Sequence, residues 1–162
     1  MPNLRAQLPI RATAVLPGEM PAMRLRVRVE VVSTQYLWVP GPLPGANEAL
    51  AACRQARGKG SAYSNMKRAY TLMVMGLAKK AKLSPVKAAN FRFTWHEPKT
   101  GRKGRDPDGV HFGAKFVLDG LVTAGVLVND GPKQVLRVVH EPIRYVPAEL
   151  CGVEVEIEEV DR

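Results

Sequence analysis

The sequence predicts an α+β fold, with one domain in which two main helices pack on a mixed, mostly antiparallel β-sheet. Some segments alternate apolar and polar residues, as strands with one buried face do, and two segments repeat apolar residues at three- and four-residue spacing, as amphipathic helices do. The 162 residues are 46% hydrophobic and 24% charged, which is enough to bury one core. This length excludes a multidomain enzyme that carries a large cofactor module of its own.

The first half of the chain predicts a lead-in, a strand, a loop and a helix. Residues 1–22 are rich in proline and small side chains, so we expect an irregular lead-in before a folded domain over 23–162. The alternation from 25 to 31 predicts a strand. The prolines of 39–45 predict a rigid loop and neither helix nor central strand, because proline lacks a backbone donor. Apolar spacing over 64–83 predicts the first helix.

The second half predicts further strands around a second helix. In chain order, we expect a strand over 91–95, a helix over about 109–124, a short strand over 126–128, a turn at 129–131 and a strand over 134–140. The tail alternates valine and isoleucine with glutamate over 153–158. Because its outer face is acidic, we expect this strand at an edge of the sheet.

The charge of the chain is concentrated in one region. There are 24 lysines and arginines against 15 acids, a net charge of +9. Residues 54–105 hold 14 of these cations and a single acid, Glu97, so this segment carries +13 and the rest of the chain −4. A basic segment of this kind favours a polyanionic partner, nucleic acid first.

Two glycine-containing basic loops, at 54–61 and 99–105, are the candidates for contact with phosphates. Their cations are Arg54, Arg57, Lys59, Lys99, Arg102, Lys103 and Arg105. For any single lysine, a solvated surface position is the simpler interpretation.

Cysteine content and hydropathy bear on the compartment. Cys53 and Cys151 lie far apart and match no zinc or disulfide spacing, which favours a reduced, intracellular setting. No stretch approaches the ~20 apolar residues of a membrane span, and the N-terminus lacks the apolar segment of a secretory signal. We therefore expect a soluble, cytoplasmic protein with no membrane partner.

Four of the five aspartates lie within 25 consecutive residues, directly after the basic segment. They are Asp106, Asp108, Asp119 and Asp130. Carboxylates beside a phosphate-binding surface would repel the ligand unless a cation lies between them. Mg²⁺ is commonly held by a few carboxylates and substrate phosphates, and such ions assist phosphodiester hydrolysis. Because Pro107 favours an extended conformation at Asp106, the first two carboxylates are expected to face one ion.

Each of these residues also has a structural interpretation. Asp106 followed by Pro107 is a good helix start, Asp130 with a following glycine is an ordinary hairpin turn, and Asp119 with Lys115 forms a solvated pair one helical turn apart. Phe112 and Phe116 are expected beyond the core face of the second helix, in a dimer contact or a second core contact. The three histidines, His96, His111 and His140, are interpreted as structural or surface residues.

The segment from Arg105 to Leu121, with residues 124–130 after it, resembles the signature of RusA-like Holliday junction resolvases. In that family an Asp-x-Asp-Asn motif leads into a helix with Lys and, four residues later, Asp, and then an Ala-Gly turn, a short strand and an acidic pair. The matching positions are Asp106, Asp108, Lys115, Asp119, Ala124, Gly125 and Asp130. Gly109 stands where the family has Asn, and Asn129 stands at the first acid of the pair. The proline loop at 39–45 followed by Asn47 looks like the N-terminal half of the family.

The resemblance implies a metal-dependent endodeoxyribonuclease that resolves four-way DNA junctions in recombination and repair, in a phage or prophage context. It implies Asp106, Asp108 and Asp130 as ligands of Mg²⁺ or Mn²⁺, Lys115 as a catalytic cation, and a homodimer. Asp119 and Asn129 are possible accessory residues. Two alternatives stay open: a weakened or inactive junction-binding protein of the same fold, and an RNA-binding or ribosome-associated basic module.

Overall fold

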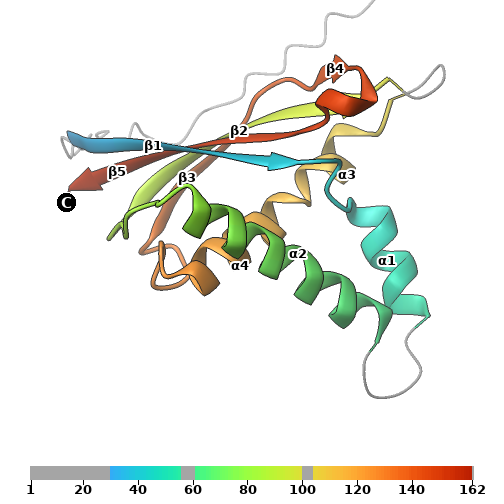
Figure 1. Ribbon diagram of the computed structural model, residues 1–162, viewed down its shortest axis with the longest axis horizontal. Helices are drawn as coiled ribbons and strands as arrows, with labels where there is room; N and C mark the ends of the chain where they lie inside the picture. The colour runs from blue at the N-terminus through green and yellow to red at the C-terminus, as the bar shows by residue number, and fades with distance from the viewer. Residues whose placement is uncertain (1–29, 56–60, 100–103, 162) are drawn as a thin grey trace, which may run out of the picture.

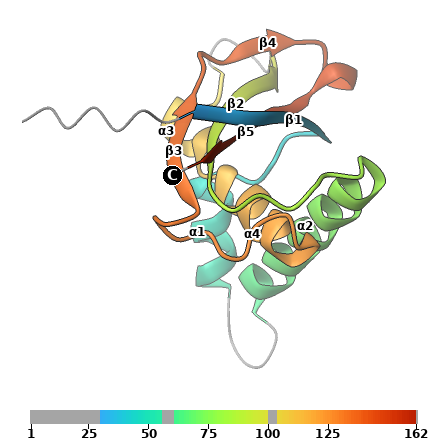
Figure 2. The same ribbon diagram turned by 90° about the vertical axis from the view of Figure 1, so that its left-hand side faces the viewer.

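The computed structural model describes residues 30–55, 61–99 and 104–161 (Figure 1). Its elements in chain order are β1 (Glu30–Pro40), α1 (Ala46–Arg54), α2 (Ala62–Lys80), β2 (Ala89–Pro98), α3 (Pro107–His111), α4 (Ala114–Ala124), β3 (Val135–His140), β4 (Arg144–Val146), a short 3-10 helix (Ala148–Leu150) and β5 (Gly152–Asp161). The strands form one mixed sheet, and Figures 1 and 2 show α2 and α4 on one side of it. The predicted α+β class is therefore confirmed.

The last strand lies in the middle of the sheet. The strand order is β1-β5-β2-β3, with β4 also paired to β2. β5 runs antiparallel to both β1 and β2, whereas β3 and β4 run parallel to β2. The predicted edge position of the tail strand is therefore wrong. Its apolar residues are fully buried, and two of its outward glutamates have partners on β2, where the Asn90 amide donates to Glu158 and Arg92 lies 3.7 Å from Glu156.

The first described strand is longer than the sequence indicates. Val39 and Pro40 end β1 although the proline-rich run predicts a loop there. A proline is tolerated at this position because β1 lies at an edge of the described sheet and ends at Pro40. Of the predicted strand over 25–31, only Glu30 and Val31 lie in the described part of the chain, where both belong to β1, and the lead-in over 1–22 lies outside it.

The first predicted helix is confirmed as α2, whereas the second is divided. α3 and α4 are separated at Phe112 and Gly113. A Cβ at Gly113 would lie 3.0 Å from the Leu43 Cβ and 3.1 Å from the Trp95 ring, so the backbone lies directly against the core between the two helices. α1 was not predicted from the sequence, and it places Arg54 at the end of a helix instead of in a loop.

The predicted short strand over 126–128 is absent from the described sheet. Val126 and Leu127 donate backbone hydrogen bonds to the Leu121 carbonyl instead, after Gly125 ends α4 with a left-handed φ of 81°. The Val126 carbonyl accepts from Val86 in the segment before β2. The turn at 129–131 exists, with the Gly131 amide donating to the Asn129 side chain over 2.8 Å. It is no hairpin, because the β3 that follows pairs in parallel with β2.

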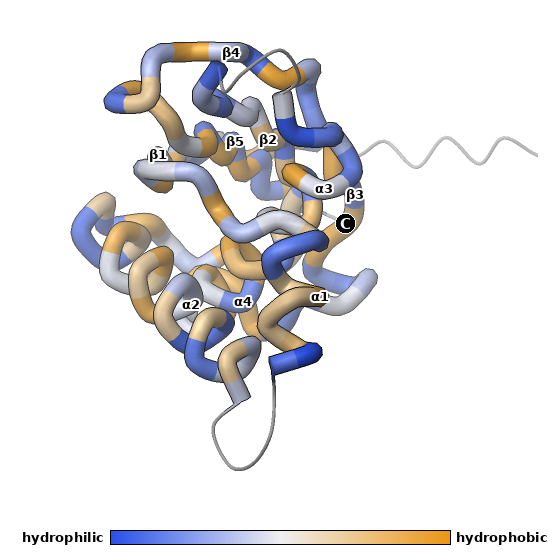
Figure 3. The backbone as a smooth tube through the Cα atoms, turned by 90° about the vertical axis from the view of Figure 1, so that its right-hand side faces the viewer, coloured by the Kyte–Doolittle hydropathy of each residue, from blue (hydrophilic) through white to orange (hydrophobic). Residues whose placement is uncertain are grey.

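The core lies between the sheet and the helices. It joins aromatic residues of β2 to aliphatic residues of β5, α2 and α4; among its members are Phe91, Phe93, Trp95, Val155, Ile157, Val74, Val117 and Leu121. Phe116 is fully buried, with its ring 5.8 Å from that of Tyr70, so it is a core contact. Figure 3 shows apolar and polar segments alternating along α2, as expected for a helix buried on one side. None of the described helices combines the length and apolar character needed to cross a bilayer.

Candidate carboxylate site

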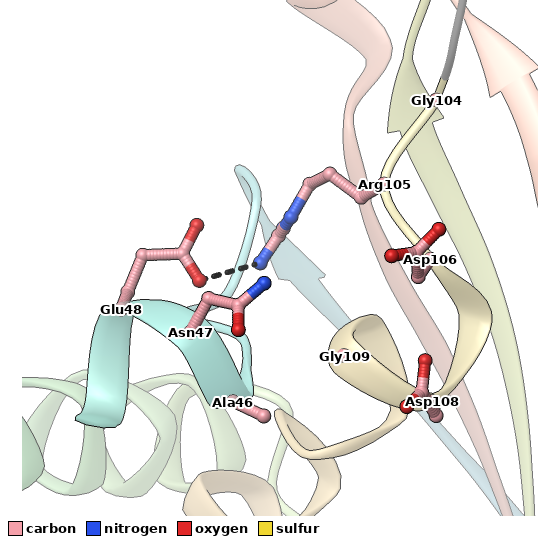
Figure 4. Close-up of a pocket in the computed structure, with 8 residues that line it drawn as sticks. All are labelled: Ala46, Asn47, Glu48, Gly104, Arg105, Asp106, Asp108 and Gly109. Atoms are coloured by element: carbon pink, nitrogen blue, oxygen red, sulfur yellow. Dashed lines mark hydrogen bonds and ion pairs between the residues drawn. The ribbon is translucent and has the colours of Figure 1, made fainter. Parts of the chain in front are cut away.

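A polar cavity of about 270 Å³ lies between α1 and the chain that enters α3. It is lined by Ala46, Asn47, Glu48, Gly104, Arg105, Asp106, Asp108 and Gly109. Figure 4 shows Asn47 and Glu48 on α1 to one side, with Arg105 and the two aspartates on the other. The structure thus brings together Asp106 and Asp108, the first two predicted ligands.

The start of α3 explains how both carboxylates reach this cavity. Asp106 has extended backbone angles (φ −64°, ψ 136°) and Pro107 occupies the first helical turn, so the helix-start interpretation holds for the backbone. Within the described residues, however, the Asp106 side chain makes no capping hydrogen bond. Asp108 lies within α3 and not in an extended segment, and both residues are exposed. Their carboxylates are therefore open to solvent and to a ligand.

Arg105 holds the two sides of the cavity together. Its Nη1 lies 3.2 Å from Glu97 Oε2 and donates over 3.1 Å to the Leu43 carbonyl, while its Nη2 lies 3.4 Å from Glu48 Oε2. Glu97, the single acid of the basic segment, is only 2% exposed at the end of β2. The guanidinium predicted to bind DNA is thus paired with a buried carboxylate, and through Glu48 it also links the start of α3 to α1.

Glu48 is the lining residue that sequence reasoning missed, because α1 was not recognised. One local signal was present: Glu48 stands three residues after Gly45, and the Gly45 amide donates to its carboxylate over 3.1 Å. This is the backbone half of a capping box at the start of α1. Only the family resemblance pointed to Asn47, and no local pattern in the sequence did.

A second group of charges lies where α2 meets α4. Lys67 is 3.1 Å from Asp119, and Lys115 is 3.7 Å from the other oxygen of the same carboxylate. The hydrogen bond with Asp119 raises the pKa of Lys67 above its ordinary value, against burial, and Asp130 adds a smaller favourable effect. Lys115 and Asp119 are therefore part of a three-membered ion cluster, and Asp130 lies within electrostatic range of it.

The three predicted metal ligands do not all lie in the same cavity. Asp106 and Asp108 share the cavity, whereas Asp130 is absent from its described lining and acts on Lys67 instead. Across the described ranges, no three Asp, Glu, His or Cys side chains form a group suited to hold a metal. The donor chemistry nevertheless fits Mg²⁺ or Mn²⁺, since magnesium is often bound through one or two carboxylates and completed by water and substrate phosphates.

The remaining predicted binding residues are only partly described. Arg54 at the end of α1 and Lys99 directly after β2 are both exposed. Arg57, Lys59, Arg102 and Lys103 lie outside the described residues. Asn129, the possible accessory residue, is exposed and accepts the local hydrogen bond from Gly131.

Two of the histidines form a stacked pair beside α3. The rings of His111 and His140 are 4.1 Å apart and nearly parallel, at 7°. The Trp95 indole donates to His140 Nδ1 over 3.1 Å. Burial, and then the neighbouring His111, lower the pKa of His140 from 6.5 to about 4. Burial also lowers the pKa of His111, although Asp108 acts in the opposite direction.

Comparisons with known proteins add no assignment to this geometry. A scan against models of protein families finds no match to the chain, and a search of curated proteins finds none either. The function must therefore be inferred from the residues and their arrangement.

Proposed function

We propose that the protein is a metal-dependent, structure-selective endodeoxyribonuclease that resolves four-way DNA junctions by hydrolysing paired phosphodiester bonds. The observation that carries the proposal is the cavity in which Asp106 and Asp108 lie together. The chain before them is strongly basic. Exposed paired carboxylates next to cations suit a phosphate and a divalent ion in one place. The resemblance to RusA-like resolvases supports the same reaction.

Asp106 and Asp108 would hold Mg²⁺ or Mn²⁺. When bound, the ion supplies an activated water and neutralises charge on the phosphoryl oxygens. Around it, the Arg105 ion pairs keep α1 against the start of α3, so Asn47 presents its amide to the same cavity. In this proposal, that amide donates a hydrogen bond to a phosphate oxygen and fixes the orientation of the strand.

Lys115 and Asp130 enter the proposal through the resemblance. Lys115 is the proposed cation for the leaving oxygen, and Asp130 the proposed third carboxylate. Both lie with Lys67 and Asp119 and not in the described lining of the cavity. A DNA strand that spans the cavity and the ion cluster would contact first the carboxylates of Asp106 and Asp108 and then the two lysines beside Asp119. Arg54, Lys99 and the other basic-loop residues would contact backbone phosphates without reading sequence.

The proposed assembly is a homodimer. A two-fold dimer presents two identical sites, which suits the symmetric strands of a four-way junction. Paired cuts then follow from the symmetry of the assembly.

The test is incubation of the purified protein with a mobile four-way junction and with a linear duplex of the same sequence, each in Mg²⁺, Mn²⁺ or EDTA. We expect metal-dependent nicking of the junction in preference to the duplex. Asp108→Asn should reduce nicking at least 100-fold, whereas Glu154→Gln, a matched change on the exposed sheet face, should leave it unchanged.

Binding of the junction without cleavage in either metal would reject the nuclease in favour of a non-catalytic junction-binding protein. The separation of Asp130 from the cavity is the observation that favours this second function. Preference for structured RNA over the junction would reject both.

A further inference from the structure

A second cavity, of about 390 Å³, adjoins the carboxylate site. Its walls include Pro107, His111, His140, Glu141, Ile143 and Tyr145. Pro107 stands between the two aspartates in the chain. It lines the second cavity, whereas Asp106 and Asp108 line the first. A ligand that reaches from one cavity to the other passes the start of α3.

Two histidines line one wall of this cavity. His111 and His140 lie in parallel planes, with ring centroids 4.1 Å apart. Because the Trp95 indole donates to Nδ1 of His140, this nitrogen is an acceptor and the ring is neutral. Because the two rings are parallel, their nitrogen lone pairs lie in parallel planes. These lone pairs therefore do not point at one common ion. The pair is therefore not arranged for chelation, and since each ring covers one face of the other, the exposed ring of Tyr145 is the free stacking face.

Tyr145 connects the two cavities. It is 51% exposed on β4 and lines the second cavity, while Gly104 lines the first. A Cβ added at Gly104 would overlap the Tyr145 ring, so the ring lies directly against the backbone that leads to Asp106. An exposed aromatic ring in this place offers a stacking face beside the chain segment that leads to the carboxylates.

Polar groups are also present. Glu141 supplies a carboxylate, held by Arg92 over 2.7 Å. His111 Nε2 is buried and has no hydrogen-bond partner among the described residues. Aromatic faces with a few polar groups are the usual composition of a pocket for a nucleobase.

We propose that this cavity, here called the imidazole–tyrosine pocket, binds one unstacked nucleobase of the DNA strand whose phosphate lies at Asp106 and Asp108. The inference rests on the proposed function and names a further contact for it. Extruding a base from a duplex costs a few kcal/mol, and the cost is least where pairing is already disturbed. The pocket therefore gives the protein a physical reason to prefer a branch point over linear duplex.

The test is fluorescence anisotropy in EDTA, so binding is measured without metal or cleavage. The probes are a fluorescein-labelled immobile four-way junction and versions in which one nucleotide at the branch is abasic. The intact protein is expected to lose about tenfold in affinity for the abasic version at one branch position, since stacking contributes about 1–3 kcal/mol per base. Tyr145→Ala should bind both probes equally, and Tyr145→Phe should keep the difference.

Two further variants complete the experiment. Gly104→Ala, which displaces the Tyr145 ring, is expected to behave as Tyr145→Ala does. Leu72→Ala removes an exposed apolar side chain on α2 and should keep the tenfold difference. Thermal melting confirms that each variant is folded.

Equal affinity of the intact protein for all probes would show that the pocket does not bind a base. The proposed metal-dependent cleavage would not be affected by that result. A difference that persists in Tyr145→Ala would overturn the pocket as well. Failure to bind any of the DNA probes would overturn both the pocket and the proposed function.

Discussion

At the scale of single residues, the ion pair between Arg105 and Glu97 decides the shape of the carboxylate site. Glu97 is nearly inaccessible to water, and Arg105 is the cation that offsets its charge. A buried carboxylate that loses its partner is strongly destabilising, because its desolvation is no longer compensated. Arg105 therefore contributes to the stability of the fold, and its contact with DNA stays a prediction.

We expect Arg105→Met to lower the free energy of unfolding by about 3 kcal/mol. Lys99→Met, a matched change at an exposed position directly after β2, should change it by less than about 0.5 kcal/mol. Urea denaturation followed by circular dichroism measures both. If Arg105→Met kept full stability and lost only DNA affinity, the anchoring role would be wrong.

The stacked histidines predict a dependence of stability on pH. The pKa of His140 is about 4 in the folded protein and 6.5 ordinarily, so between these values the unfolded chain binds the proton more readily. The contribution of His140 is therefore complete above about pH 6.5 and is lost as the pH falls toward 4. Between pH 7 and pH 5 we expect a loss of about 1–2 kcal/mol from this residue.

The measurement is the free energy of unfolding of the intact protein and of His140→Gln at both pH values. The variant should lose less stability on acidification, because glutamine does not titrate and its oxygen still accepts from Trp95. His96→Gln, outside the stacked pair, should lose as much as the intact protein. Equal losses in all three would contradict the prediction.

At the scale of elements, the contact between α2 and α4 depends on Gly120. A Cβ there would lie 2.5 Å from the Val74 Cβ and 3.2 Å from the Thr71 carbonyl. The two helices therefore approach at a distance that no larger residue permits. This approach also places Lys67 of α2 against Asp119 of α4.

Two glycine substitutions test this packing in opposite directions. Gly120→Ala should lower the free energy of unfolding by about 1–3 kcal/mol, because the helices must move apart. Gly76→Ala on α2, where no described atom lies within 4 Å of the new Cβ, should raise it by about 0.5–1 kcal/mol. Denaturation midpoints measure both changes. A stabilising Gly120→Ala would show that the helices are not in close contact.

The elements that could be predicted from the sequence are those whose signal is local. The spacing in α2 and the alternation in β2 are properties of consecutive residues, and both elements were found. The central place of β5 and the hydrogen bond from Val86 to the Val126 carbonyl depend on partners far along the chain, so no local pattern revealed them. In α1 only Ala49 is buried, and one buried residue makes no periodic signal.

The same distinction holds for the candidate site. Asp106 and Asp108 are two residues apart, and their common cavity follows from their proximity in the chain. The separation of Asp130 from them depends on how the segment after α4 turns, which is a tertiary effect. Glu48 lines the cavity because α1 carries it to the side opposite Arg105, which is also a tertiary effect.

At the scale of the whole molecule, the outer edge of β1 is the surface where we expect the proposed homodimer to form. Among the described strands, β1 pairs with β5 alone. Val31, Val32, Tyr36 and Trp38 on this strand are exposed. Unpaired strand edges with apolar side chains are sites where chains associate.

We therefore expect Val32→Lys combined with Tyr36→Lys to convert the proposed dimer into a monomer, because charges oppose pairing at an edge. Size-exclusion chromatography with light scattering measures the mass. Val128→Lys, at a side chain 78% exposed away from the sheet, should remain a dimer. A dimer that survives the double change would place the interface elsewhere, and a monomeric intact protein would reject the homodimer.

The central position of β5 also determines when the molecule can fold. Ser33 on β1 hydrogen-bonds to Glu159 on β5, 126 residues later in the chain. Until β5 has left the ribosome, β1 and β2 have no strand between them, and their apolar faces stay unpaired. Sheets that depend on such distant pairings fold slowly. The sheet that carries β2 and its buried Glu97 is therefore completed only after β5 has been synthesised.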